Sequence, residues 1–306
     1  MNSFLREQLH DWPLAAQNFN ALERVVTRTL TVDGFPVRLQ HNPGRIQSTG
    51  AKVSPEAISK RPCFLCAPNR PEQQRATPFS ASRDYEILVN PFPIAPEHFT
   101  VAATEHLHQD LIEIADMEAF VKKYPDYAAF YNGSKSGASA PDHLHFQACN
   151  KDFLQEIIAH VSDCKVLIKG TPGAQIFALP ELPMQAIYFV AETVTPEVRF
   201  WTDNVLPAAE GGLTPDQGMR NLVMWQHEGQ LHLLFFPRAK HRPDCFFAEG
   251  DAQRLISPGA LDMAGVLILP RHEDYDRLTA ADVRRVYDEV SFYYKDSPYF
   301  SHALTL

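Results

Sequence analysis

The chain has 306 residues, of which 45% are hydrophobic and 21% are charged, with a formal net charge of −9 at pH 7. This composition is typical of a folded globular protein and excludes a disordered chain. The acidic charge excludes a basic surface for bulk nucleic-acid binding, so any phosphate-bearing ligand needs a local cluster of cations.

The N-terminal residues 1–19 carry charged side chains throughout and predict a polar helix instead of a signal peptide. No apolar run reaches the roughly 18 residues of a membrane span, so we expect no membrane partner. Five cysteines, an odd number with one close pair, favour a reducing compartment and predict a cytoplasmic protein.

The first half of the chain predicts an α+β arrangement. Residues 28–42 form two strands around an Asp33-Gly34 turn, followed by a basic loop over 42–52. Strands over 85–90 and 98–103 flank a proline-rich turn, and apolar spacing predicts a helix over 108–124. A strand over 127–133, a loop over 134–142 and a strand over 143–149 complete this half.

The second half repeats this order of elements without an exact sequence repeat. Strands over 185–193 and 220–238 form a second meander, 206–218 is an exposed connection, and 279–294 is a helix. We therefore expect two domains, over 1–160 and 161–306.

The strand at 143–149 carries the first candidate site. Alternation places His143, His145 and Gln147 on one face and buries Leu144 and Phe146 on the other. The glycine-rich loop before it can present backbone N–H groups to an anion, and an imidazole beside bound phosphate can act as a nucleophile. The alternative is that both histidines are surface residues of an amphipathic strand.

Two further clusters have open interpretations. Cys63-x-x-Cys66 can bind zinc with histidines from elsewhere, with His98, His106, His108 and His143 as candidates, or can be two buried small residues. Basic side chains at 238–242, together with Arg45 and Lys52, can bind an anion or be solvated.

Three segments, at 85–106, 132–147 and 256–271, resemble the histidine-triad superfamily in its nucleotidyltransferase and phosphorylase branch. The resemblance implies two tandem histidine-triad-like halves, each with an antiparallel sheet and packed helices. It makes His145 the nucleophile and has Gln147 hold the phosphate. It implies a structural zinc ion on Cys63, Cys66, His106 and His143. The expected substrate-binding residues are Arg45, Asn90, Asn132, Ser134, Gly137, Ser139 and Lys240.

The expected reaction is cleavage of a nucleoside diphosphate sugar, with GDP-hexose favoured, by inorganic phosphate through a covalent nucleotidyl-histidine. A diadenosine polyphosphate phosphorylase and a catalytically silent nucleotide-binding protein are the alternatives, and Gln147 argues against a hydrolase. A homodimer is left open. Asp142 is inserted relative to this family, so the geometry of the loop before His143 is also open.

Overall fold

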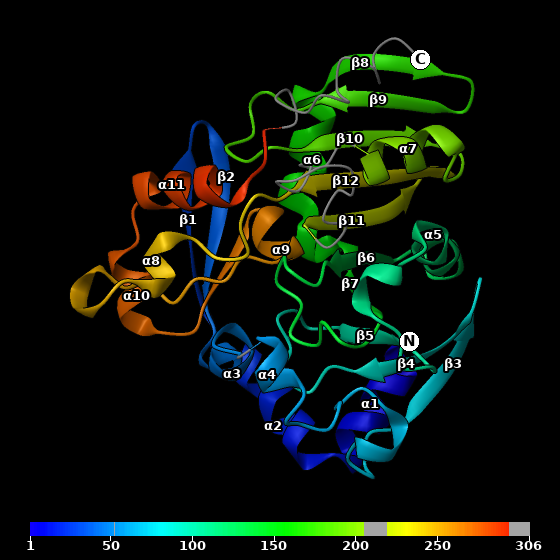
Figure 1. Ribbon diagram of the computed structural model, residues 1–306, viewed down its shortest axis with the longest axis vertical. Coiled ribbons are helices and arrows are strands. Elements are labelled where there is room, and N and C mark those ends of the chain that lie inside the picture. The colour runs from blue at the N-terminus through cyan, green and yellow to red at the C-terminus, as the bar shows by residue number, and fades with distance from the viewer. Residues whose placement is uncertain (52, 205–218, 294–306) are drawn as a thin grey trace.

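The computed structural model describes residues 1–51, 53–204 and 219–293, and its centre is one antiparallel sheet. This sheet has ten strands in the order β3-β4-β5-β7-β6-β11-β12-β10-β9-β8, and a smaller sheet has the order β1-β2-β13 (Figure 1). The strands are β1 (Val26–Val32), β2 (Phe35–His41), β3 (Ala76–Ser80), β4 (Asp84–Val89), β5 (His98–Ala103), β6 (Tyr127–Asn132), β7 (His145–Asn150), β8 (Val166–Thr171), β9 (Ala174–Ala178), β10 (Ile187–Ala191), β11 (Arg220–His227), β12 (Gln230–Pro237) and β13 (Val266–Leu269). The helices are α1 (Asn2–Asp11), α2 (Pro13–Leu22), α3 (Ile46–Thr49), α4 (Pro55–Ile58), α5 (Ile114–Lys123), α6 (Gln155–Cys164), α7 (Pro196–Asn204), α8 (Asp244–Phe247), α9 (Ala260–Met263), α10 (His272–Arg277) and α11 (Ala280–Val290).

The two halves of the large sheet have the same strand order. In the first half the order is β3-β4-β5-β7-β6, with α5 between β5 and β6 in the chain. In the second half it is β8-β9-β10-β12-β11, with α7 between β10 and β11. The halves meet where β6 pairs antiparallel with β11, which places Asn132 opposite Asn221. The expected α+β fold with two tandem halves is therefore confirmed, and the expected domain boundary at residue 160 stays a prediction.

The halves differ in one connection that matters for the site. Between β6 and β7 the chain makes a long loop over 133–144, whereas β11 and β12 are joined by the two residues Glu228 and Gly229. Both of these residues have positive φ, as a tight hairpin turn requires. The same conformation occurs at Asp33 and Gly34, where the sequence predicts a turn.

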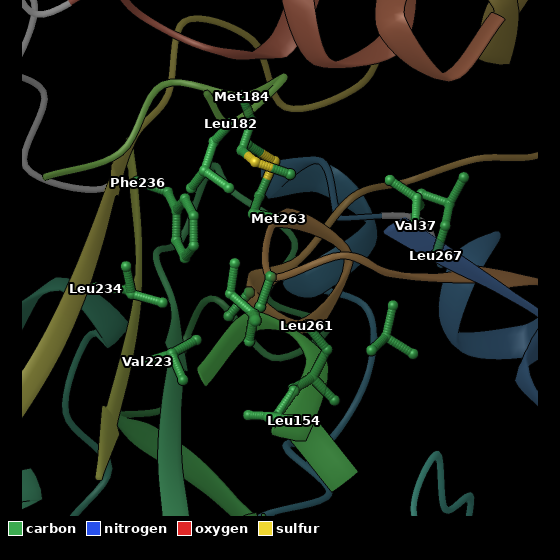
Figure 2. Close-up of a cluster of buried hydrophobic side chains, with 14 of the residues drawn as sticks. Val37, Leu154, Leu182, Met184, Val223, Leu234, Phe236, Leu261, Met263 and Leu267 are labelled. Atoms are coloured by element: carbon green, nitrogen blue, oxygen red, sulfur yellow. The ribbon is translucent and has the colours of Figure 1, made fainter. Parts of the chain in front are cut away.

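Each face of the large sheet is covered by its own hydrophobic core. Leu144 and Phe146 belong to the core against α1, α5 and α7. The opposite face, which carries His145 and Gln147, packs in the second half against α9, α11 and the small sheet. Figure 2 shows this second core, in which side chains of β11 and β12 meet those of α9 and of the β2–β13 pair: Val223, Leu234, Phe236, Leu261, Met263, Val37 and Leu267.

Several predicted element boundaries are wrong for identifiable reasons. The N-terminal helix is divided into α1 and α2 at Pro13, which starts a new helix at its first position. Helix α5 begins at Ile114, and Leu111 lies half exposed before it. Strand β7 begins at His145, because His143 lies in a turn closed by its N–H and the carbonyl of Ala140. Lys52 and the predicted connection over 206–218 lie outside the described residues.

Within the described part of the chain, every helix is too short or too polar to cross a membrane.

Candidate active site and metal centre

His145, the first residue of β7, is held as a neutral imidazole with a fixed proton. Its Nδ1 lies 2.8 Å from the carbonyl oxygen of His143, which can only accept, so Nδ1 carries the proton. Burial lowers the pKa of His145 to about 4, and its exposed fraction is 4%. Nε2 therefore keeps its lone pair at neutral pH, which is the state that a nucleophile needs.

The amide of Gln147 is oriented by a second buried histidine. His98 Nδ1 accepts from the N–H of Ile94, so His98 Nε2 carries the proton and donates to Gln147 Oε1 at 2.9 Å. Burial lowers the pKa of His98 to about 3, which keeps this tautomer neutral. Asn90 Nδ2 also approaches Gln147 Oε1, at 3.5 Å. With its oxygen occupied and no acceptor for its Nε2 among the described residues, Gln147 has its two N–H donors left for a ligand.

Gln147 lines a polar pocket between the first half of the sheet and the segment 257–268. Its other walls are Arg45, Ser48, Thr49, Ile94, Phe130, Asn132, Gly137, Ser257, Gly259, Ala260, Leu261, Asp262 and Ile268. Arg45 is anchored by Phe92 O at 2.6 Å and Ser48 Oγ at 3.0 Å, while its buried Nε has no partner among the described residues. Burial lowers the pKa of Arg45 to about 10, so it stays charged at neutral pH. The hydroxyls, amides and guanidinium of this pocket can bind a phosphorylated ligand, and Asp262 adds one carboxyl group to the same wall.

The remaining predicted binding residues lie in different places. Asn132 lines the pocket, and its Oδ1 accepts from the N–H of Ala260 at 2.7 Å and from Asn221 Nδ2 at 2.9 Å. Ser134 is bound through its N–H and Oγ to Asp110, and neither Ser134 nor Ser139 is in the pocket wall. Lys240 is exposed and pairs with Asp244 at 2.8 Å, also outside this wall.

In the basic segment after β12, Arg238 is buried and Arg242 is partly buried, whereas Lys240 is exposed. Arg238 is fully buried, and its five N–H groups have acceptors on Asn221, Pro258, Val290, Lys240 and His241. Arg242 donates to the carbonyls of Thr49 and Ala51 and to Ser257 Oγ. These two arginines connect the segments that form the pocket, so their visible role is structural.

Gly137 lies where the loop over 133–144 touches the opposite wall. Its φ is +98°, and a Cβ there would be 2.8 Å from Gly259 Cα and 3.0 Å from Pro258 O. Both the backbone conformation and the space therefore require glycine.

We expect Gly137→Ala to lower the free energy of unfolding by about 2 kcal/mol or more, because strain and a backbone clash add. Gly229→Ala is the control, since Gly229 also has positive φ but a Cβ there meets nothing within 4 Å. Urea unfolding of both variants checks this. Equal losses in the free energy of unfolding of the two variants would mean that the contact with Gly259 does not contribute to the effect.

Cys63, Cys66, His106 and His143 form one cluster, whose ligand atoms all lie within 4.8 Å of one another. The contacts from sulfur to Nδ1 are 3.2–3.4 Å, close to the roughly 3.6 Å edge between sulfur and nitrogen in tetrahedral zinc coordination. Burial and the neighbouring Cys63 raise the pKa of the Cys66 thiol to about 11, so a cation would be needed to hold its thiolate. Two sulfurs and two imidazoles in this arrangement fit a zinc ion.

His143 connects this cluster to His145. Its Nε2 donates to the carbonyl of Ala103 at 2.8 Å, which leaves Nδ1 for a metal, and its own carbonyl holds His145. The candidates His98 and His108 are wrong, because His98 binds Gln147 and His108 is exposed beside Asp110. The inserted Asp142 forms an ion pair with Arg61 at 3.0 Å, so it ties the loop before His143 to the cysteine segment.

Sequence reasoning missed the residues that support the site. Gln109, which hydrogen-bonds the backbone of His145, lies outside the three segments of the resemblance. Asp262, which caps α9 and lines the pocket, lies within the segment 256–271, but the resemblance assigned it no role. Burial raises the pKa of Asp262 to about 6, although the N–H groups of Gly259 and Ile268 act in the other direction. Only its strand position could have indicated the role of His98: on β5 it lies on the same face of the sheet as Gln147 on the neighbouring strand β7.

Comparison with solved structures tests the fold. The chain superimposes on the crystal structure of yeast Ap4A phosphorylase Apa2 with a TM-score of 0.59 and 13% identity, covering 94% of this chain and 97% of that chain. The same enzyme in complex with Ap4A gives a TM-score of 0.55 and 15% identity, with 94% and 97% covered. The fold is histidine-triad-like.

Comparison of the sequence with known families says less about this chain than comparison of the structure does. A family model described as a domain of unknown function, DUF4922, matches residues 4–150, which include Cys63, His145 and Gln147. No curated protein matches the sequence. The histidine-triad-like assignment is therefore an assignment of fold, and the chemistry depends on the side chains themselves.

Proposed function

We propose that this protein is a nucleotidyltransferase that acts as a phosphorylase, and that His145 forms a covalent nucleotidyl intermediate. The observation that carries the proposal is the fixed tautomer of His145, whose Nδ1–H is bound to the His143 carbonyl. Gln147, two residues later on the same face of β7, offers amide donors to the pocket that Arg45 lines. Phosphoryl transfer requires a nucleophile, hydrogen-bond donors to the phosphate oxygens and a positive charge.

In the first step, the lone pair of His145 Nε2 attacks the α-phosphorus of the nucleotide substrate. A P–N bond forms, the P–O bond to the leaving group breaks, and a sugar phosphate or nucleotide departs with the electron pair. In the second step, an oxygen of inorganic phosphate attacks the same phosphorus and displaces the imidazole. The nucleotide leaves as a nucleoside diphosphate, and His145 returns to its starting state.

The remaining predicted residues support these steps in defined ways. Asn132 and Gly137 line the same pocket and would contact the phosphates, and Asn90 would contact the ribose as well as Gln147. Ser139 and Ser134 would act through the loop over 133–144, and Lys240 would act only if its segment moves toward the ligand. A zinc ion on the Cys63 cluster would supply rigidity to the turn that carries His143.

We favour a nucleoside diphosphate sugar of the GDP-hexose type as substrate. A diadenosine polyphosphate is the second candidate, favoured by the likeness in fold to a yeast enzyme crystallised with Ap4A. The polar pocket wall, with hydroxyls from Ser48, Thr49 and Ser257, suits a hydroxyl-rich sugar leaving group.

The test is a labelling experiment with the intact chain. The protein is incubated with GDP-hexoses and diadenosine polyphosphates that carry ³²P at the α-position, with and without inorganic phosphate. We expect an acid-labile label on histidine that is released by phosphate as a nucleotide product. Binding without any label would support the silent nucleotide-binding alternative, and turnover without added phosphate would identify a hydrolase.

A further inference from the structure

The backbone of His145 lies where the pairing of two central strands stops. The antiparallel ladder between β6 and β7 ends at the pair Phe130 and Gln147. Continuing the same register would place Asn132 opposite His145, but at this position β6 pairs only with β11, and the pair of Asn132 and His145 is not in the ladder. The buried peptide groups of His145 therefore need other partners.

A single side chain, that of Gln109, provides these partners. Its Nε2 donates to the carbonyls of Asn132 at 2.8 Å and His145 at 2.9 Å, and its Oε1 accepts from the N–H of His145 at 2.9 Å. Both N–H bonds of the amide are used, and the residue is fully buried. The amide thus connects the two strand ends at the position where a backbone pair is missing.

Gln109 is itself held on both sides. Its N–H donates to the carbonyl of Pro141 at 3.3 Å, and its carbonyl accepts from the hydroxyl of Tyr131 at 2.9 Å. Pro141 belongs to the loop before His143, and Tyr131 belongs to β6. Gln109 therefore links the loop, β6 and the first residue of β7 into one hydrogen-bonded unit.

We propose that Gln109 is a positioning residue for nucleotidyl transfer, an inference that rests on the proposed function of His145. It touches no reacting atom; it holds the backbone of His145 while the His143 carbonyl holds the ring. The imidazole then has a defined backbone position and a defined ring orientation before substrate binds. A displacement of about 1 Å at a reacting group can slow a reaction by about 100-fold.

The chain offers a matched control for the loss of such an amide. Gln8 on α1 is also fully buried, donates to the carbonyl of Gln73 and accepts from the N–H of Arg75. The variants Gln109→Met and Gln8→Met both remove an amide from a buried site, where the first bonds three backbone groups and the second bonds two. Stability loss alone affects both variants, whereas loss of positioning affects only the first.

Two measurements on the intact chain test the proposal. We expect Gln109→Met to slow formation of the nucleotidyl-histidine at saturating GDP-hexose by about 100-fold, with KM changing less than about threefold. We expect Gln8→Met to stay within about twofold of the parent rate. Hydrogen exchange should show faster exchange of the His145 amide in Gln109→Met and no change there in Gln8→Met. If Gln109→Met does not fold, the isosteric Gln109→Glu, which keeps the acceptor but loses the donors, takes its place.

The outcomes separate the two proposals. Unchanged exchange at His145, or equal rate losses in the two methionine variants, would overturn the role of Gln109. If the parent chain transfers no nucleotide to His145, the proposed function fails, whereas the exchange of the His145 amide still decides whether Gln109 holds it.

Discussion

We expect that replacing His145 by alanine abolishes formation of the proposed nucleotidyl-histidine and lowers turnover by about 10⁴-fold or more, while the fold is retained. No other side chain takes its place in the proposed reaction, because Gln147 offers no nucleophilic nitrogen. The structural cost is limited to one imidazole and its bond to the His143 carbonyl, about 1–3 kcal/mol. Single-turnover labelling with ³²P-nucleotide and circular dichroism check the two parts.

His232→Ala is the matched control for this variant. His232 lies on β12, the strand that corresponds to β7, and burial lowers its pKa to about 4 as well. Its Nδ1 contacts the hydroxyl of Tyr188. We expect the His232→Ala chain to be labelled by ³²P-nucleotide as the parent chain is. Full turnover in the His145→Ala chain would refute the mechanism, and loss of label in both variants would mean that the effect is not specific to His145.

We expect that replacing Cys63 by serine removes the metal from the proposed zinc site and destabilises the chain. We expect about one zinc ion per chain in the parent protein and none in Cys63→Ser, with a loss of about 4 kcal/mol in the free energy of unfolding. Cys63 contacts His143, whose carbonyl orients His145, so the variant should also form the nucleotidyl-histidine more slowly. Metal analysis by mass spectrometry and thermal unfolding with and without a chelator provide the measurements.

Cys245→Ser is the control for the loss of a thiol. Cys245 is partly buried and lies outside the cluster of Cys63, Cys66, His106 and His143. Its replacement should leave the zinc content and the response to chelator unchanged. A metal-free parent chain whose stability does not respond to chelator would contradict the zinc assignment.

The sequence predicted those parts of the fold that depend on local periodicity. The alternation at His145, Phe146 and Gln147 identified both faces of β7, and Asp33-Gly34 identified the first hairpin. Pairing between halves was not predictable in this way, because the β2–β13 contact joins segments more than 200 residues apart and no local pattern encodes it.

The residues of the candidate site were likewise predictable only in part. The resemblance to a known family named the cysteines and histidines that the structure brings together. It named neither Gln109 nor Arg238, because each acts on backbone groups that any residue possesses. His98 was one of four possible zinc ligands from the sequence alone, and the structure places it on Gln147, because a sequence position does not show the direction of the ring.

The short turn at Glu228 and Gly229 also bears on the number of reaction centres that the proposed mechanism allows. A scaffold with two equivalent halves has room for two reaction centres, but a connection of two residues provides no loop that could surround a phosphate group. On β12, moreover, Leu234 and Phe236 lie on the face that carries His145 and Gln147 on β7. The proposed mechanism therefore predicts one nucleotidyl group per chain, and from the second half of the chain the segment 257–268 supplies a wall of the pocket that Gln147 lines.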